Sequence, residues 1–319
     1  MTNLKKIGLT ALAGTLATTS FANAGSMDVG GVAQMIWDNN QTDSSSVAGK
    51  SADAFSMNTS LLFTGSGEMD NGWNVSVYQA ITGGNFYSGD MAVDMGDMGE
   101  LSMFKGTNRV GIASIQDKVP NAGEQPWDDN ADGADGSHGG PADGIADPHG
   151  GNDTLGYKIS ANGFTASASA DFGANGSSSS AAVSFTAVEG LNIGAGIGEY
   201  QSSATLNDDL ETYYVSYAMG PVSVGAQHTK VEAETANTDV ERDSYGITLA
   251  VNENFSIGYG VSDTEYELSS KTKDEENTGI QASYTTGGMT VGFVNNQKDN
   301  ANGTTENLET TEIKLTFAF

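Results

Sequence analysis

The chain of 319 residues contains no cysteine. This absence excludes a disulfide framework and a lipoprotein anchor. The sequence also lacks an apolar run of the roughly 18 residues that a membrane-spanning helix needs. Insertion into a membrane would therefore have to use strands, and the stability of the fold would have to come from strand pairing.

Basic residues are scarce. Lys and Arg number 13 against 41 Asp and Glu, which gives a formal net charge of −28. This charge argues against nucleic acid as a partner, because the phosphates would be repelled, and it favours cations. The alternative is that the charge only keeps exposed loops in solution.

The first 24 residues are typical of a secretory signal peptide. Lys5 and Lys6 precede an apolar run over 7–16, and Ala22-Asn23-Ala24 supplies small residues for cleavage before Gly25. The mature chain, 25–319, is long enough for one large barrel, and loss of the two lysines moves its net charge to −30.

The last residues show the pattern that decides the fold class. Ile313, Leu315, Phe317 and Phe319 fall on one side of an extended strand, because strand side chains alternate with period two. Elsewhere the second side of this pattern carries Gly, Ser and Thr, which are too small and polar to fill a core. The alternation predicts an all-β protein whose apolar face is outward, and only a closed transmembrane antiparallel β-barrel can hold such a sheet in lipid.

Turn signals recur through the second half of the chain and predict one hairpin per repeat, with short turns on one side and longer loops on the other. Eleven strands follow from Thr154 onward, with Phe164, Ala166 and Ala168 outward and Thr165 facing the lumen. Together with five noisier strands before residue 107 they make 16 strands. The five earlier strands are expected at 28–37, 55–64, 72–81, 90–95 and 100–106, and the turns at Asn162-Gly163, Glu189-Gly190, Gly220-Pro221, Glu253-Asn254 and Gly287-Gly288.

The segment 107–152 is different. It holds four of the five prolines of the chain and a rough repeat of Ser-His-Gly-Gly-Pro and Pro-His-Gly-Gly, so neither strand nor helix is expected there. Connections of this length without secondary structure are usually functional or disordered.

Two stretches resemble the general bacterial porins, the sixteen-stranded trimeric proteins of the Gram-negative outer membrane. Residues 63–72 are similar to the second strand and turn of that family, and 99–106 to its fifth strand. The resemblance implies that 107–152 is the long third loop, folded into the lumen as a constriction, and that the first five strands bury part of a homotrimer contact. It also implies contact with outer-membrane lipid and lipopolysaccharide, and roles in barrel closure and assembly for Phe317 and Phe319.

The resemblance also implies the residues of the constriction. The family often carries arginines on its early strands, opposite an acidic third loop, but residues 58–62 contain no basic residue. An acidic loop with little opposing charge favours cations. The alternative is a solvated surface insertion. The expected pore-constriction residues are Lys105, Arg109, Asp117, Glu124, Asp128, Asp129, Asp132 and Asp135, with Lys50 as a further basic candidate.

Asp128, Asn130 and Asp132 resemble the start of a calcium loop, with oxygen ligands at alternate positions. The closing glutamate is absent, since Gly139 stands there. Calcium is therefore an optional structural clip, and no cofactor is required. His138 and His149 could bind a transition metal, although drift in a Gly/Pro-rich segment explains them better.

The sequence thus predicts a non-enzymatic channel for passive diffusion of small hydrophilic solutes and ions, with a preference for cations. One alternative is a secreted, acidic, calcium-binding β protein similar to adhesins. The other is an outer-membrane barrel hydrolase that uses one of the three histidines.

Overall fold

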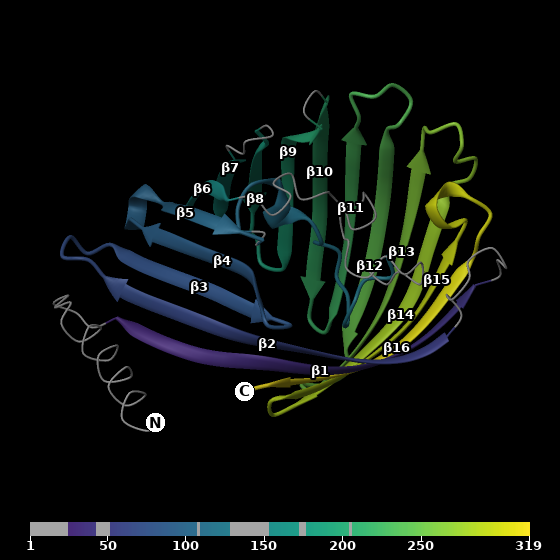
Figure 1. Cartoon of the computed structure of the whole chain (residues 1–319), viewed down its shortest axis with the longest axis horizontal. Coiled ribbons are helices and arrows are strands. Elements are labelled where there is room, and N and C mark those ends of the chain that lie inside the picture. Colours follow the sequence, from purple (N-terminus) through teal and green to yellow (C-terminus); the bar gives the residue numbers. More distant parts are fainter. Residues whose placement is uncertain (1–24, 43–51, 107–108, 128–152, 172–176, 204–205) are drawn as a thin grey trace, which may run out of the picture.

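The chain folds into a single closed barrel in which every strand is antiparallel to its two neighbours (Figure 1). The computed structural model describes residues 25–42, 52–106, 109–127, 153–171, 177–203 and 206–319. Within these ranges no helix is long and apolar enough to cross a bilayer. The predicted 16-stranded barrel is confirmed.

Each strand pairs with the strands before and after it in the chain, and β1 pairs with β16 to close the barrel. The strands are β1 (Ser26–Thr42), β2 (Ala52–Glu68), β3 (Asn74–Thr82), β4 (Asn85–Asp94), β5 (Glu100–Lys105), β6 (Thr154–Ala161), β7 (Phe164–Asp171), β8 (Ser179–Phe185), β9 (Leu191–Ser203), β10 (Leu206–Met219), β11 (Val222–Glu232), β12 (Val240–Ala250), β13 (Phe255–Tyr266), β14 (Glu275–Thr286), β15 (Met289–Asp299) and β16 (Leu308–Ala318).

The turns are short, as expected, at the end of the barrel where β1 begins and β16 ends. Two-residue turns are confirmed at 162–163, 220–221 and 287–288. The other two predicted two-residue turns are wrong, because the connections are 186–190 and 251–254. In the second, the Asn252 side chain accepts hydrogen bonds from the backbone N–H of Asn254 and Phe255, and this side-chain turn needs the extra residues.

The predicted bounds of the fourth strand are also wrong. β4 begins at Asn85, five residues earlier than expected, because Gly83 and Gly84 make a two-residue turn after β3. Both glycines have positive φ, 58° and 83°, which other residues rarely adopt. The strands expected from the sequence leave a longer connection, over 82–89, at the end of the barrel opposite the short turns.

The outer face of the barrel is apolar along most of the strands. On β1, Met27, Val29 and Met35 face outward and are 52–75% exposed. Met35 lies opposite Met57 of β2, which is 75% exposed on the same face. Such exposure of large apolar side chains is expected where lipid or another subunit covers them. The prediction of a sheet with its apolar side outward is confirmed.

Candidate pore constriction

The described part of the long connection between β5 and β6, residues 109–127, lies against the inner wall of the barrel. Near its start, the backbone N–H of Gly111 donates to Ser167 Oγ on β7 and that of Ile112 donates to Ser180 Oγ on β8, both at 3.0 Å. Ile112 then packs on Leu210 of β10. The segment is therefore held by lumen-facing side chains of several successive strands.

The same contacts continue further round the wall. Gln227 of β11 accepts a hydrogen bond from the Lys118 backbone N–H at 2.8 Å and donates one to the Ile115 carbonyl at 3.0 Å. Gln281 of β14 accepts one from the Ala122 N–H at 3.1 Å. For residues 109–127, the expected entry of this loop into the lumen is confirmed, and the remainder of the loop up to 152 lies outside the described residues.

A row of glycines makes room for the segment. Gly225, Gly246, Gly260 and Gly279 lie directly opposite one another on β11, β12, β13 and β14. A Cβ atom on Gly246 would lie 2.5 Å from both the Pro120 carbonyl oxygen and a methyl carbon of Val119, and one on Gly225 would lie 2.5 Å from Cδ of the same proline. A larger side chain at Gly225 or Gly246 would push the segment away from the wall.

The far end of the segment is buried and internally bonded. Trp127 Nε1 donates to Gln125 Oε1 at 2.8 Å, and Gln125 Nε2 donates to the Val119 carbonyl at 3.1 Å. Glu124 reaches across to β16, where Lys314 Nζ donates to its Oε2 at 2.7 Å. This part of the lumen is thus narrowed by a segment fixed at both ends.

Arg109 lies at the start of the segment in a cluster of opposite charges. Its guanidinium is 3.1 Å from Asp90 Oδ2 on β4 and 3.0 Å from Glu100 Oε1 on β5. Lys158 of β6 lies 3.3 Å from the same Glu100 oxygen. The four side chains carry two positive and two negative charges, so the cluster is close to neutral.

The structure brings together only some of the predicted constriction residues. Arg109, Asp117 and Glu124 all belong to the segment in the lumen. Asp128, Asp129, Asp132 and Asp135, and with them Asn130 of the expected calcium loop, lie outside the described residues, as does Lys50. Among the residues that are described, no cluster of His, Asp or Glu could hold a metal ion.

The assignment of Lys105 to the constriction is wrong. On β5 the side chains of Leu101, Met103 and Lys105 share the exposed outward face, while Ser102 and Phe104 are buried on the lumen side. Period-two alternation therefore directs Lys105 away from the pore.

Sequence reasoning also missed four basic residues that face the lumen. Lys158, Arg242 and Lys298 share register with the lumen-facing Glu100, Thr264 and Asn277. Arg242 Nη2 and Lys298 Nζ lie 3.6 and 3.9 Å from Glu275 Oε1. The alternation of side chains along the strands is the signal that could have found them. The four residues are Lys158, Arg242, Lys298 and Lys314.

Lys118 differs from these lysines because it belongs to the loop segment rather than to a strand. Partial burial of its ammonium group lowers its pKa from the ordinary 10.5, and the neighbouring Asp117 carboxylate opposes that shift in part. Burial disfavours the charged form because water is removed from around it.

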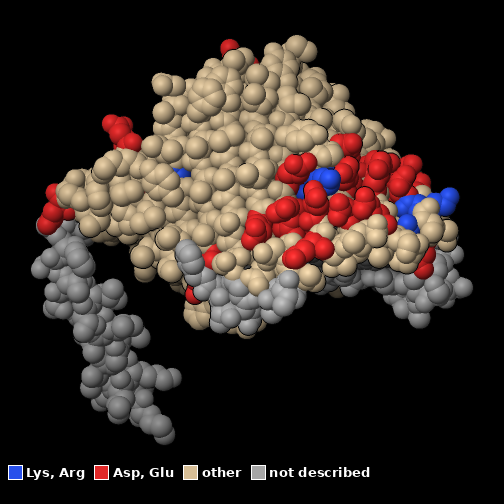
Figure 2. All heavy atoms as spheres, turned by 90° about the horizontal axis from the view of Figure 1, so that it is seen from above, with Lys and Arg blue, Asp and Glu red and all other residues tan. Residues whose placement is uncertain are grey.

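Much of the negative charge lies on the outer wall instead. Figure 2 shows acidic side chains gathered on one side of the molecule with few basic ones among them. Asp243, Asp263, Glu276 and Asp299 lie directly opposite one another on β12, β13, β14 and β15, with their side chains outward. This row is called the carboxylate row below.

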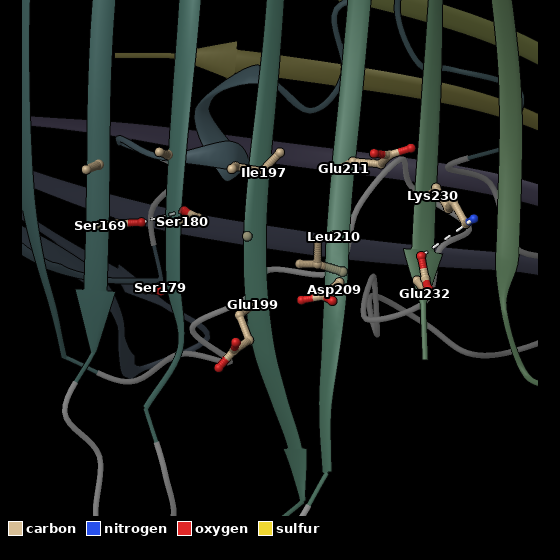
Figure 3. Close-up of a pocket in the computed structure, with 13 residues that line it drawn as sticks. Ser169, Ser179, Ser180, Ile197, Glu199, Asp209, Leu210, Glu211, Lys230 and Glu232 are labelled. Atoms are coloured by element: carbon tan, nitrogen blue, oxygen red, sulfur yellow. Dashed lines mark hydrogen bonds and ion pairs between the residues drawn. The ribbon is translucent and has the colours of Figure 1, made fainter. Parts of the chain in front are cut away.

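A groove of about 630 Å³ lies on β7–β11 (Figure 3). Small outward residues such as Ala168 and Ala181 form part of it, and the acidic side chains of Glu199, Asp209 and Glu232 border it. Lys230 pairs there with Glu232 at 3.7 Å. The groove lies on the outer face and does not belong to the constriction.

The residues expected to close the barrel lie at the seam between β1 and β16. The backbone groups of Phe319 and Gly31 exchange two hydrogen bonds, at 2.7 and 3.0 Å, and Phe317 lies opposite Ala33. The Phe319 ring covers Gly31, where an added Cβ would lie 2.4 Å from the ring. The seam is thus continuous to the last residue.

The described histidine, His228, lies on the outer face of the barrel. His228 Nδ1 lies 2.9 Å from Asp243 Oδ1, and its ring stacks on Tyr213 at 4.8 Å between centroids. Tyr213 and Asp243 are also its register partners on the adjacent strands, so neither neighbour provides a serine or threonine hydroxyl. His138 and His149 lie outside the described residues.

Comparison with known families decides the class of protein. The sequence model of the family described as "Gram-negative porin" matches residues 8–319. The chain belongs to the Gram-negative porin family. It is therefore an outer-membrane porin, which agrees with the resemblance found in the sequence. A comparison with curated proteins gives no match.

Solved porin structures share the fold. An anion-selective porin from Comamonas acidovorans is 14% identical, with a TM-score of 0.65 over 93% of this chain and 100% of that one. OmpF of Salmonella typhi, solved with daunomycin, is 10% identical, with a TM-score of 0.68 over 92% and 97%. The trimer form of OmpT from Vibrio cholerae is 12% identical, with a TM-score of 0.64 over 93% and 100%. At these identities the likeness concerns the fold, so selectivity has to be argued from the residues of this chain.

Proposed function

We propose that this porin is a passive, water-filled diffusion channel for small hydrophilic solutes and ions, with a preference for cations. The observation that carries the proposal is the segment 109–127, which lies inside a barrel whose inner wall is polar. A polar wall lets water fill the lumen, and an inserted segment limits the size of the solutes that pass. Residues 1–24 act in this proposal as the export signal.

The charges inside the barrel support the preference for cations. Among the described residues, carboxylates that face the lumen or lie on the inserted segment outnumber the basic side chains there, and charge along a narrow aqueous path favours the opposite ion. The carboxylates are Asp28, Asp38, Glu68, Asp90, Asp94, Glu100, Asp117, Glu124, Asp171, Asp208, Glu275 and Glu312, and the basic residues are Arg109, Lys118, Lys158, Arg242, Lys298 and Lys314.

A homotrimer is part of the proposal, with the outer face of β1–β5 as the contact. This face is rich in methionine, with Met35 opposite Met57 and Met91 opposite Met103. The outer face of β10–β14 instead carries exposed tyrosines, such as Tyr245. Methionine adapts to an irregular protein surface, whereas tyrosine suits a lipid interface. Lipopolysaccharide is the proposed lipid partner around the remaining wall.

Planar bilayers test the channel. The refolded mature protein should form channels whose reversal potential in a KCl gradient has the sign of a cation-selective pore. Asp117→Asn should reduce this potential, because it removes a carboxylate of the lumen segment. The matched change Asp209→Asn, on the outer wall, should leave it unchanged. An unheated gel should show a trimer that dissociates to monomer on boiling.

Each part of the proposal can fail separately. Absence of conductance from correctly folded protein would contradict the channel. An anion-selective reversal potential would contradict the charge argument while leaving diffusion intact. A monomer in mild detergent that still conducts would contradict the trimer alone.

A further inference from the structure

A pocket of about 340 Å³ opens into the lumen on the wall formed by β1–β4. Its lining includes hydroxyl groups of Ser26, Thr64 and Ser76, the ring of Tyr78 and the carboxylates of Asp28 and Asp90, with the Arg109 side chain at one edge. The pocket is near the lower end of the size range of ligand sites, roughly 300–1,000 Å³. The pocket shares Asp90 and Arg109 with the charged cluster at the start of the lumen segment, whereas Ser26, Asp28, Thr64, Ser76 and Tyr78 are not part of that cluster.

Strand register aligns the pocket residues in a single row. Asp28 of β1 lies opposite Thr64 of β2, Thr64 opposite Tyr78 of β3, and Tyr78 opposite Asp90 of β4. Residues directly opposite each other have Cβ atoms roughly 5 Å apart. A ligand in the pocket would therefore meet the Tyr78 ring. The Asp28 carboxylate lies two strands away on one side of this ring, and the Asp90 carboxylate lies on the adjacent strand on the other side.

The two carboxylates differ in their partners. Asp90 is 3.1 Å from the guanidinium of Arg109, within the neutral cluster that also contains Glu100 and Lys158. Asp28 is exposed to the lumen, and in the described part of the chain no side chain forms an ion pair or hydrogen bond with its carboxylate. The same holds for the Tyr78 hydroxyl. The pocket therefore keeps one net negative charge, located at Asp28.

We propose that this pocket is a subsite for small organic cations, namely solutes that carry a primary or quaternary ammonium group. The ammonium lies between the Asp28 carboxylate and the face of Tyr78, which attracts cations through its ring electrons. The serine and threonine hydroxyls take up polar substituents of the solute. The proposal rests on the diffusion channel proposed above and adds a class of solute to it.

A bare metal cation fits the pocket less well. Metal ions such as calcium need six to eight oxygen ligands in a close shell. Among the described residues no group of three or more carboxylates or histidines is arranged to hold a metal. Asp28 alone gives one negative charge, and the aromatic ring beside it adds attraction for an ammonium that keeps little of its water.

Block of current by choline tests the subsite. Potassium current through single channels in planar bilayers is recorded while choline chloride is added, and the block is expressed relative to the current of each variant without choline. Wild type should be partly blocked. Asp28→Asn should raise the half-blocking concentration by roughly tenfold, because one charged contact is lost. Tyr78→Leu should raise it by roughly three- to tenfold, because one cation–π contact is lost. Tyr78→Phe keeps the ring, so choline should block this variant at the same concentration as wild type.

The control and the contrary outcomes separate this proposal from the channel itself. Asp70→Asn removes a carboxylate from the turn between β2 and β3, outside the pocket, and should not change the block. Equal half-blocking concentrations for wild type and Asp28→Asn, or no block of a wild-type channel that conducts potassium, would overturn the subsite. If wild type forms no channel at all, the proposed function fails first.

Discussion

Lys314 Nζ lies 2.7 Å from Glu124 Oε2 and 2.8 Å from Glu312 Oε1, so one ammonium group joins the end of the lumen segment to β16. The three side chains are only 9–28% exposed. These two ion pairs add to a series of hydrogen bonds from the segment to β7, β8, β11 and β14. They hold the segment near the end that lies away from β5.

Lys314→Met should loosen this end of the segment. The substitution leaves Glu124 and Glu312 facing each other without a cation, so we expect a noisier open channel and a fall in unfolding temperature of about 2–4 °C, which corresponds to roughly 1 kcal/mol. Single-channel recording and heat-dependent gel mobility measure the two effects. Lys105→Met, on the outer face, is the control. Unchanged noise and stability in Lys314→Met would show that the hydrogen bonds alone hold the segment.

Gly246→Ala should destabilise the barrel and reduce its conductance. The new methyl group would lie 2.5 Å from the Pro120 oxygen, and overpacking of this kind costs about 1–3 kcal/mol. Displacement of the segment toward the pore axis should lower the current. At Gly292, also on the lumen face, the nearest atom is 3.8 Å from an added Cβ. Gly292→Ala should therefore be neutral or stabilise by about 0.4–1 kcal/mol, through loss of freedom in the unfolded chain. Similar effects of the two changes would contradict this role of the glycine row.

The contrast between these glycines shows what the sequence could and could not reveal. Alternation alone predicted the number of strands, the outward face and the small residues of the inner face, because period two is a property of each strand separately. It gave no reason for glycine in place of serine at Gly225, Gly246, Gly260 and Gly279. That reason lies in the segment 109–127, which packs on them from a distant part of the chain.

The charges were harder to predict for the same reason. The alternation of side chains along each strand places Lys158 and Lys314 in the lumen and Lys105 outside. No pattern in the sequence shows that Lys314 meets Glu124, 190 residues earlier, or that Arg109 is shared by Asp90 and Glu100. The acidic total indicated cations as partners without showing where the charge lies, and part of it lies on the outer wall, in the carboxylate row.

Raising the pH should increase the preference for cations through Lys118. Its pKa is lowered from 10.5 by burial, so its ammonium loses its proton at a lower pH than an ordinary lysine. Below its own pKa Lys118 is positive and opposes cations, and above it the side chain is neutral. Reversal potentials in a KCl gradient should therefore become more cation-selective as the pH rises toward 10.5. Lys118→Met should already be more cation-selective than wild type at neutral pH, and its reversal potential should change less as the pH rises. An equal pH dependence in the variant would assign it to other groups.

Asp263→Asn should stabilise the barrel, most strongly at low salt. Asp263 lies directly between Asp243 and Glu276 in the carboxylate row, and like charges in opposed positions destabilise a strand pair. Removal of the central charge relieves two such repulsions, each worth roughly 0.2–1 kcal/mol. The unfolding temperature in detergent, measured at about 0.01 M and about 1 M salt, checks this, since the screening length falls from ~30 Å to ~3 Å between them. The gain over wild type should be clear at low salt and small at high salt, whereas Asp70→Asn, in a turn, should show no gain at either. A variant that unfolds earlier than wild type at low salt would mean that the row is stabilising as it stands.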